Sequence, residues 1–349
     1  MCTRLSVGHS HKATLPAPLE GPNNGAAASS GAPRVGGAYI VPWHMTNRTE
    51  PTSAAASPPH GVRAPQGSDD HAGRTGVFEH ARPRAGIPAG LHVMEREPAR
   101  GWTGYEGPVV VFVHGSLDRG ASFARTARRL PEWGLVAYDR RGYQRSRDAD
   151  PAGSLLKHVE DLCDIARAYA CSGGRLSAVG HSVGGTIVLG AACCAPELFA
   201  SAAAYEPSMP WLGFHPSRRS PPGPDGSFDA GEEAERFFRR VVGKAAWERL
   251  SEGQRAERRA DGPALVRDLR GIREGVPFDV TKLVVPTVVA AGGPSSMPHH
   301  RQTADWIAEH VPAVRRVTIA EAGHGAHFTS PDAFADLVRS AVALGDTAA

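Results

Sequence analysis

Short apolar runs alternate with amphipathic segments through most of the chain after residue 88. The run PVVVFV at 108–113 is rich in β-branched residues, which is typical of a strand buried on both faces of a sheet. Residues 155–170 carry apolar side chains with a period of about 3.6 residues, which predicts an amphipathic helix. Strands that alternate with helices predict a parallel α/β fold. We expect further strands at 91–95, 133–139, 176–179, 199–205, 284–291 and 314–320, and further helices at 123–130, 185–194, 232–250, 263–272, 302–310 and 331–344.

Two segments depart from this alternation. Residues 1–88 are crowded with Pro, Gly, Ala, Ser and His, and such a composition buries too little apolar surface to offset the entropy of ordering. We therefore expect a disordered N-terminal tail there. Residues 211–276 begin with a Pro/Gly/Arg-rich link and continue with helical patterns between two expected strands. We interpret this segment as a helical cap inserted into a core formed by residues 89–210 and 277–349.

The sequence Gly180-His181-Ser182-Val183-Gly184 stands between an expected strand and an expected helix. A serine at such a sharp turn has a strained backbone, and glycines at the flanking positions remove the collisions that side chains would cause there. The turn lifts the Ser182 hydroxyl above the sheet edge, beside the amide of Val183 and the start of the helix. The alternative, a flexible Gly/Ser loop, has to ignore the apolar flanks on both sides. We therefore predict that Ser182 is a nucleophile.

A nucleophilic serine needs a general base, and the segment after the last expected strand offers one. It reads EAGHGAH, in which two glycines flank His324. Pairing with a histidine turns the weakly nucleophilic serine hydroxyl into a strong nucleophile. His327 is the alternative base. We favour His324 because its Gly-His step directly follows the end of the strand.

The loop after the strand at 108–113 reads His114-Gly115-Ser116-Leu117. A glycine directly after a buried strand lets the backbone turn so that its N–H groups point to a common spot, as an oxyanion hole requires. We expect the amide of Ser116 or Leu117, together with that of Val183, to bind the oxyanion. His114 is expected to hold this loop by hydrogen bonds and not to act as the base.

Composition narrows the classes of function. The formal net charge is +3, and no Lys/Arg run suggests a nucleic-acid partner. The chain lacks a stretch of about 18 apolar residues and the apolar core of a secretory signal, so we expect no membrane association and place the protein in the cytoplasm. The five cysteines show no metal-binding spacing and are expected to be reduced thiols. The sequence gives no oligomeric state.

Residues 90 to 344 resemble the α/β-hydrolase fold superfamily. The segments that carry the resemblance are VVVFVHGS (109–116), VAYDRRGYQRS (136–146), VGHSVGGTI (179–187), VPTVVAAGG (285–293) and EAGHGAHFTSPDAF (321–334). The resemblance implies an α/β fold with a mostly parallel sheet of about eight strands, helices on both faces, a small helical cap and an active site at the strand ends. It also implies that neither a cofactor nor a metal is needed. It does not specify the substrate.

One departure from the superfamily concerns the acid of the Ser-His-acid triad. Most members carry it after the strand that here reads VPTVVAA, but the following loop contains no carboxylate before Asp305, which lies a helical turn or more too far along. Some members, certain haloalkane dehalogenases among them, place the acid after the strand that follows the elbow helix. Glu206, 24 residues after Ser182, holds that position here. We favour Glu206 as the partner of His324. The alternative is that Glu206 only caps the junction with the cap.

The expected activity is hydrolysis of a small ester or thioester through an acyl-enzyme, in which Ser182 attacks the carbonyl and His324 then activates water. A carbon–carbon bond hydrolase acting on a diketone would use the same serine and histidine. A non-catalytic protein of this fold that binds a small molecule is the alternative from another class, and the missing acid after residues 285–291 is its only support. A role of the tail in protein interactions is compatible with catalysis.

Overall fold

The computed structural model describes residues 77–347, except 83, 99–100, 104, 152–153, 171–174, 217–227 and 294–295. All of them belong to the second of two compact units, Val35–Ala349. The expected disordered tail lies outside the described residues up to position 76. Its expected end at residue 88 is wrong, because residues 79–80 form a strand and the flanking Val77 and Ala81 are buried.

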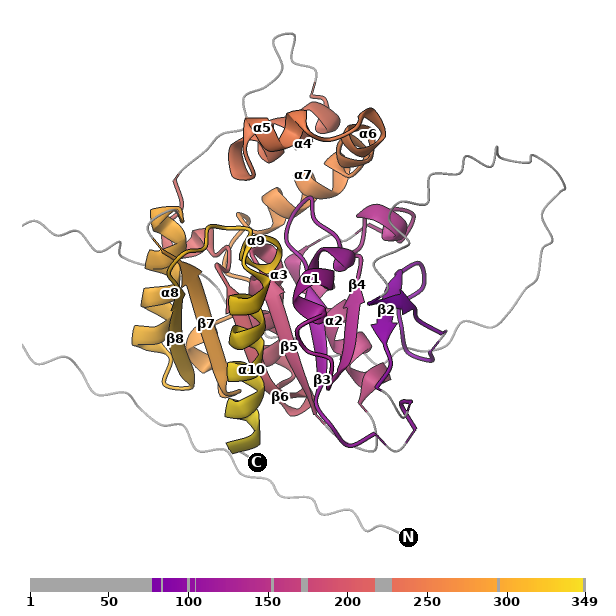
Figure 1. Ribbon diagram of the computed structural model, residues 1–349. Coiled ribbons are helices and arrows are strands. Elements are labelled where there is room, and N and C mark those ends of the chain that lie inside the picture. The colour runs from indigo at the N-terminus through magenta and orange to yellow at the C-terminus, as the bar shows by residue number, and fades with distance from the viewer. Residues whose placement is uncertain are drawn as a thin grey trace, which may run out of the picture. The chain divides into compact units, whose positions relative to one another are not determined.

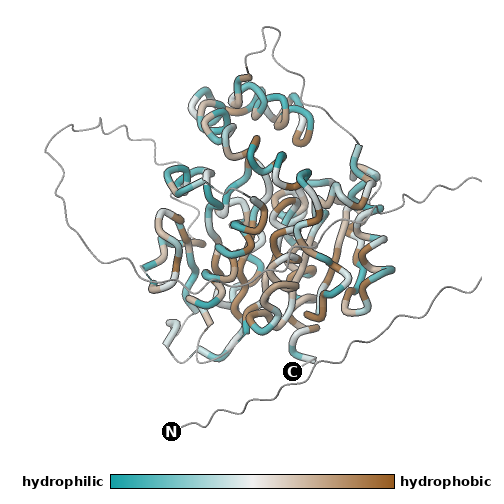
Figure 2. Tube along the Cα trace, turned by 180° about the vertical axis from the view of Figure 1, so that it is seen from behind, coloured by the Kyte–Doolittle hydropathy of each residue, from teal (hydrophilic) through white to brown (hydrophobic). Residues whose placement is uncertain are grey.

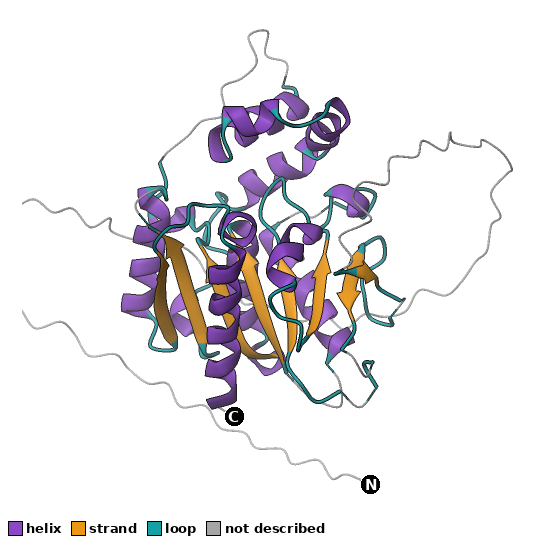
Figure 3. Ribbon diagram, viewed as in Figure 1, coloured by secondary structure: helices purple, strands orange, loops and turns teal. Residues whose placement is uncertain are grey.

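Eight strands form one sheet (Figures 1 and 3). They are β1 (Glu79–His80), β2 (Val93–Arg96), β3 (Val109–Val113), β4 (Gly134–Tyr138), β5 (Leu176–His181), β6 (Phe199–Tyr205), β7 (Thr287–Gly292) and β8 (Val314–Ile319). Their order is β1-β2-β4-β3-β5-β6-β7-β8. β2 pairs antiparallel with β1 and β4, and all pairs from β4 to β8 are parallel, so the predicted α/β fold class is confirmed.

Helices cover both faces of the sheet or lie beyond the ends of its strands (Figure 1). They are α1 (Ala124–Ala127), α2 (Leu155–Tyr169), α3 (Val183–Cys194), α4 (Ala230–Val241), α5 (Lys244–Glu248), α6 (Glu252–Ala260), α7 (Gly262–Gly271), α8 (Pro298–His310), α9 (Ala326–Thr329) and α10 (Pro331–Thr347). Short 3-10 helices are η1 (Gly120–Phe123), η2 (Gln144–Ser146), η4 (Pro196–Leu198), η5 (Pro210–Leu212) and η6 (Val280–Lys282). None of the helices in the described part of the chain is long and apolar enough to cross a lipid bilayer.

The two faces of the sheet have separate cores, because successive side chains of a strand point to opposite faces. Val111 belongs to a core cluster that also contains residues of α2, α3 and α8, such as Ile307. Its neighbour Phe112 belongs to a second cluster, which contains residues of α1 and α10, such as Phe334. β3, β4, β5 and β7 are buried along their whole length, which explains their continuous apolar character. Figure 2 shows hydrophobic positions concentrated in this central region.

α4 to α7 follow one another in the chain between β6 and β7 and lie over one edge of the sheet (Figure 1). Two expectations about this segment are wrong. The single helix expected at 232–250 is split into α4 and α5, because Gly243 has a φ of 117°, which ends the helix. α6 was not expected, since its sequence EGQRAERRA has no apolar stripe and none of its residues is buried.

Asp268 joins α7 to the core. Its Oδ2 accepts hydrogen bonds from Arg140 Nη2 at 2.7 Å and from the Tyr143 hydroxyl at 2.7 Å. Its Oδ1 lies 3.0 Å from His158 Nε2. The Arg140 side chain is completely buried, so this guanidinium depends on Asp268 to balance its charge.

The junction of β5 and α3 brings backbone into close contact. Ser182 has a φ of 56° and a ψ of −125°, in the left-handed region that residues other than glycine rarely adopt. A Cβ atom on Gly184 would lie 2.1 Å from the carbonyl oxygen of Val113, and one on Gly180 would lie 2.3 Å from the carbonyl oxygen of Gly184. α3 can therefore approach β3 this closely only if position 184 is glycine, and it can turn back on β5 this tightly only if position 180 is glycine.

We expect Gly184→Ala to lower the free energy of unfolding by about 3 kcal/mol, because α3 must move away from β3 to admit a methyl group. Urea unfolding followed by circular dichroism measures this change. Gly253→Ala is the control: a Cβ there meets nothing within 4 Å, so the replacement is expected to stabilise α6 slightly. Equal stability of Gly184→Ala and the wild type would contradict the close approach.

We expect Asp268→Ala to lower the free energy of unfolding by about 3–5 kcal/mol, because the buried Arg140 loses its counter-charge. The same urea titration applies. Asp305→Ala is the matched control, since it removes an ion pair with Arg316 whose carboxylate side is mostly exposed. The interpretation fails if the two variants unfold at the same urea concentration.

Candidate active site

Strained backbone is found at the carboxyl ends of the parallel strands. Among the described residues, four other than glycine have a positive φ: Leu117 (53°), Gln144 (48°), Ser182 (56°) and Glu206 (49°). They follow β3, β4, β5 and β6, whose parallel arrangement brings their carboxyl ends together. Conformations of this kind cluster at functional sites, because the surrounding structure has to enforce them.

Glu206 and His324 are in contact at these carboxyl ends of the strands. Nδ1 of His324 lies 2.6 Å from Oε2 of Glu206, at hydrogen-bond distance. The other carboxylate oxygen, Oε1, accepts the amide of Gly292 at 2.8 Å and the hydroxyl of Ser296. The carboxylate is completely buried. Burial alone would raise the pKa of Glu206, but the hydrogen bond and charge of His324, with Ser296 and Gly292, hold that pKa below its ordinary value.

The loop that carries His324 is fixed at a second point. The Tyr205 hydroxyl donates a hydrogen bond of 2.7 Å to the carbonyl of Gly323. Tyr205 and Glu206 therefore hold this loop from adjacent positions at the end of β6. With Nδ1 directed at Glu206, Nε2 is the nitrogen of His324 that can take a proton from another group.

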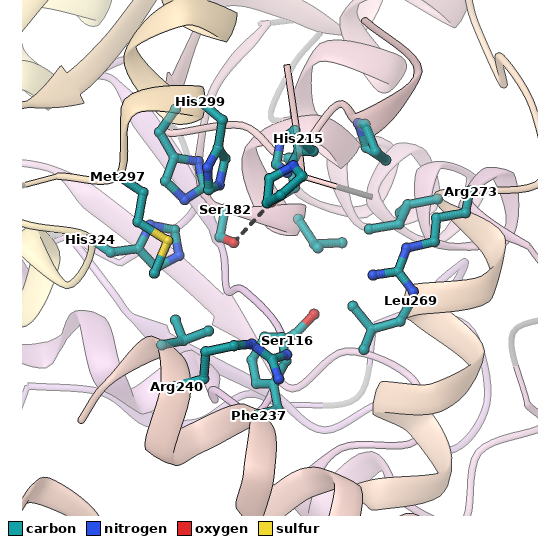
Figure 4. A pocket seen from close by; sticks show the side chains of 17 residues that line it. Ser116, Ser182, His215, Phe237, Arg240, Leu269, Arg273, Met297, His299 and His324 are labelled. Carbon is teal, nitrogen blue, oxygen red and sulfur yellow. Dashed lines mark hydrogen bonds between the residues drawn. The ribbon is translucent and has the colours of Figure 1, made fainter. Parts of the chain in front are cut away.

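A pocket of about 370 Å³ contains Ser182 and His324 in its wall (Figure 4). The Ser182 hydroxyl lies 3.3 Å from the hydroxyl of Ser208, whose carbonyl accepts a hydrogen bond from Thr186 at 2.8 Å. Within the described residues, the Ser182 hydroxyl makes its hydrogen bond to Ser208 and not to His324. Catalytic hydrogen bonds are often long in structures without substrate and tighten only in the complex.

The expected oxyanion donors lie at different distances from this pocket. Val183 and Ser116 are part of its wall, whereas Leu117 is buried outside it and its carbonyl accepts a hydrogen bond from Arg258. Val183 is the first residue of α3, so its amide has no acceptor within the helix. The loop passes close to the serine, because a Cβ on Gly115 would lie 3.0 Å from Ser182 Cβ. Of the two residues expected to supply an amide from this loop, Ser116 lines the pocket and Leu117 does not.

His114 holds the loop after β3, as the sequence predicts. Its Nε2 accepts the amide of Arg140 at 2.8 Å, and its Nδ1 lies 2.7 Å from the carbonyl of Gly115. Burial and the nearby Arg140 lower the pKa of His114 to about 4, so the ring is neutral at pH 7. Both nitrogens are occupied by backbone, which excludes His114 as the base.

His327, the alternative base, lies in a different environment. Its Nε2 is 3.1 Å from Asp118 Oδ2, and its ring centroid is 4.3 Å from that of His181. It is buried and is not part of the pocket wall. The ring of His181 lies close to the rings of both His327 and His324. Burial lowers the pKa of His181 well below its ordinary value, and the charges of these two neighbours lower it further. Asp305, the first carboxylate after β7 and expected to lie too far along the chain, is mostly exposed and pairs with Arg316.

Sequence reasoning missed several residues at the site. Ser208, which follows β6, contacts Ser182, and Ser296, which follows β7, contacts Glu206. Their places after these strands are their only signal in the sequence. Among the residues that the structure describes, three groups of side chains hold possible metal-ligand atoms within 4.8 Å of one another. These groups are His215, His299 and His300; Asp118, His181 and His327; and Glu206, His300 and His324.

Solved structures with a similar fold come from hydrolases that act on different compounds. A serine hydrolase involved in carbazole degradation is 19% identical, with a TM-score of 0.55 over 76% of this chain and 99% of that chain. A membrane phospholipase A is 18% identical, with a TM-score of 0.54 over 76% and 88% of the two chains. The N-formylmaleamic acid deformylase of Pseudomonas putida S16 is 18% identical, with a TM-score of 0.52 over 75% and 99%. At such identities the likeness shows the fold and not the substrate.

The search of curated protein sequences finds no significant match. The family model described as "Alpha/beta hydrolase family" matches residues 110–337, which include nearly all of β3, the whole of β4 to β8 and the first part of α10. This match covers well over half of the chain and contains the Ser182 turn, Glu206 and His324. The expected resemblance is thereby confirmed, and the chain belongs to the alpha/beta hydrolase family.

Proposed function

We propose that the protein is a serine hydrolase that cleaves a small ester or thioester through an acyl-enzyme. The observation that carries this proposal is the 2.6 Å contact between Glu206 and His324, which lines the same pocket as Ser182. Family membership supports a hydrolase, and the strained turn of Ser182 supports a nucleophile at this position.

The proposed reaction has two halves. The Ser182 hydroxyl adds to the substrate carbonyl while its proton passes to Nε2 of His324, and the amides of Val183 and Ser116 stabilise the oxyanion. The carbon–oxygen or carbon–sulfur bond then breaks, and His324 gives its proton to the leaving alcohol or thiol. A water molecule next adds to the acyl group and loses a proton to His324. When the bond to Ser182 breaks, the serine recovers its proton and the carboxylic acid is released.

Glu206 supports this cycle by its charge and its position. The imidazolium that forms twice in the cycle lies against a carboxylate whose pKa is held below its ordinary value, so Glu206 stays ionised at neutral pH. The same contact selects the tautomer in which Nδ1 carries the proton. The proposal therefore assigns to Glu206, at the end of β6, the role that most members of the superfamily give to a residue after β7.

We expect a fluorophosphonate probe to form one adduct with the wild-type protein, on Ser182. Intact mass and peptide mapping detect the adduct, which should be absent from Ser182→Ala. Glu206→Gln should slow labelling by about 100-fold or more, because the neutral amide no longer stabilises the imidazolium. Asp305→Asn is the matched control and should label at the wild-type rate.

Two outcomes would contradict the proposal. Without an adduct on the wild type, the chain would be better described as a non-catalytic protein that binds a small molecule. If Glu206→Gln and wild type were labelled equally fast, Ser182 could still be the nucleophile, but the assignment of the acid to Glu206 would be wrong.

The residues of the pocket wall favour a narrower class of substrate. Arg240 of α4 and Arg273, which follows α7, belong to this wall, and no carboxylate is among its described residues. Phe237, Leu269 and Met297 contribute apolar surface (Figure 4). A pocket with cationic and apolar walls favours an acyl group that combines a short hydrocarbon chain with a negative charge. We therefore propose that the acyl group carries a carboxylate or another anionic group.

We expect kcat/KM for p-nitrophenyl hemiglutarate to exceed that for p-nitrophenyl valerate, an ester of similar length without the charge. Arg273→Gln should reduce this preference about fivefold, the effect of one partly exposed ion pair. Arg270→Gln is the matched control, because Arg270 is exposed near the end of α7 but lies outside the pocket wall. A preference for the uncharged ester, or one that Arg273→Gln leaves unchanged, would contradict an anionic acyl group.

A further inference from the structure

Three histidines gather in the pocket wall beside Ser182 (Figure 4). His299 and His300 belong to the first turn of α8, and His215 lies in the segment between β6 and the cap helices. The ring centroids of His215 and His299 are 4.3 Å apart, and those of His299 and His300 are 4.2 Å apart. One nitrogen of each ring lies within 4.8 Å of the others. Two parts of the chain far apart in sequence therefore direct imidazoles to the same point.

Two of these rings have a buried nitrogen without a hydrogen-bond partner in the described structure. They are Nε2 of His215 and Nδ1 of His300. Buried polar atoms are nearly always hydrogen-bonded in folded proteins, so each such atom calls for an explanation. A ligand that accepts electron pairs from both nitrogens would supply it.

The chemistry of the cluster suits a transition metal. Neutral imidazoles are ligands of Zn²⁺, Cu²⁺ and Ni²⁺, whereas Mg²⁺ and Ca²⁺ prefer oxygen. Three histidines are also the ligand set of tetrahedral zinc sites that keep a fourth position open. Small ring movements would bring nitrogens that now lie within 4.8 Å of one another onto one ion.

The other two groups of possible ligands are weaker candidates. In the group of Asp118, His181 and His327, Asp118 and His327 already bond to each other at 3.1 Å. In the group of Glu206, His300 and His324, the carboxylate is bonded to His324, Ser296 and Gly292. Both nitrogens of His181 and Nδ1 of His327 also lack a hydrogen-bond partner in the described structure, but neither ring lines the pocket. His215, His299 and His300 all do, so a ligand in the pocket can reach them.

We propose that His215, His299 and His300 form a binding site for a divalent transition-metal ion, with Zn²⁺ as the best match. The ion links two parts of the chain, because His215 belongs to the segment before α4 and the other two histidines belong to α8. Because three histidines leave a fourth ligand position open, it also accepts an oxygen of water or of an anionic group in the pocket.

The test is calorimetric titration of the metal-free, full-length protein with ZnCl₂, combined with Co²⁺ absorption spectroscopy as a report of tetrahedral coordination. It is carried out on the Ser182→Ala variant as well, so the result does not depend on the proposed hydrolysis. Wild type and Ser182→Ala should both bind Zn²⁺ at this site. His215→Gln and His299→Gln should each weaken that binding by at least about tenfold, the smallest loss that changes around metal ligands usually cause.

His310→Gln is the matched control, because His310 is on the same helix but outside the cluster, where its Nδ1 lies at the carbonyl of Trp306 and its ring stacks on that of Trp306. It should bind Zn²⁺ like the wild type, and near-ultraviolet circular dichroism checks that all variants keep their fold. Histidines outside the cluster contribute equally in every variant, so the difference between variants isolates the site. The proposal is overturned if the wild type binds no Zn²⁺, or if His215→Gln and His299→Gln bind it as tightly as the wild type.

Discussion

The close contact between α3 and the end of β3 is the constraint on which the site depends. Gly184 lets the backbone of α3 reach the carbonyl of Val113, and the turn between β5 and α3 is then too tight for an unstrained Ser182. A non-glycine residue at a positive φ costs about 1–3 kcal/mol, so the surrounding packing has to enforce it. α3 supplies that packing, because ten of its twelve residues are buried. The position of the serine hydroxyl is therefore fixed by the backbone.

Glu206 connects three loops that would otherwise be independent. One of its oxygens binds His324 in the loop after β8, and the other binds the end of β7 and the Ser296 hydroxyl. The loop after β7 thus receives the carboxylate and does not need to supply one. This arrangement leaves the residues that follow, His299 and His300, available for the pocket wall. Because Glu206 supplies the carboxylate from the end of β6, the loop after β7 can carry other side chains in its place.

The sequence predicts most of this architecture because its signals are local. A run of β-branched residues such as 108–113 or the turn around Ser182 needs no knowledge of distant residues, and Glu206 could be chosen from its place after a strand. α6 could not be predicted, since none of its residues is buried and its pattern carries no apolar stripe. The cluster of His215 with the α8 histidines was also invisible, and the sequence was expected to have no metal site. Its members come from separate segments that only the folded chain brings together.

The contacts of Asp268 determine how the pocket can open. Lifting all four helices α4 to α7 together would pull Asp268 away from Arg140 and leave the buried guanidinium without its counter-charge, which costs several kcal/mol. α4 is joined to α7 differently, through apolar packing around Phe238 and Leu265. If α4 slides along α7 while α7 stays in place, no buried ion pair is separated. By these contacts alone, a sliding movement of α4 costs less free energy than lifting of all four helices, so the two sides of the pocket differ in how easily they move.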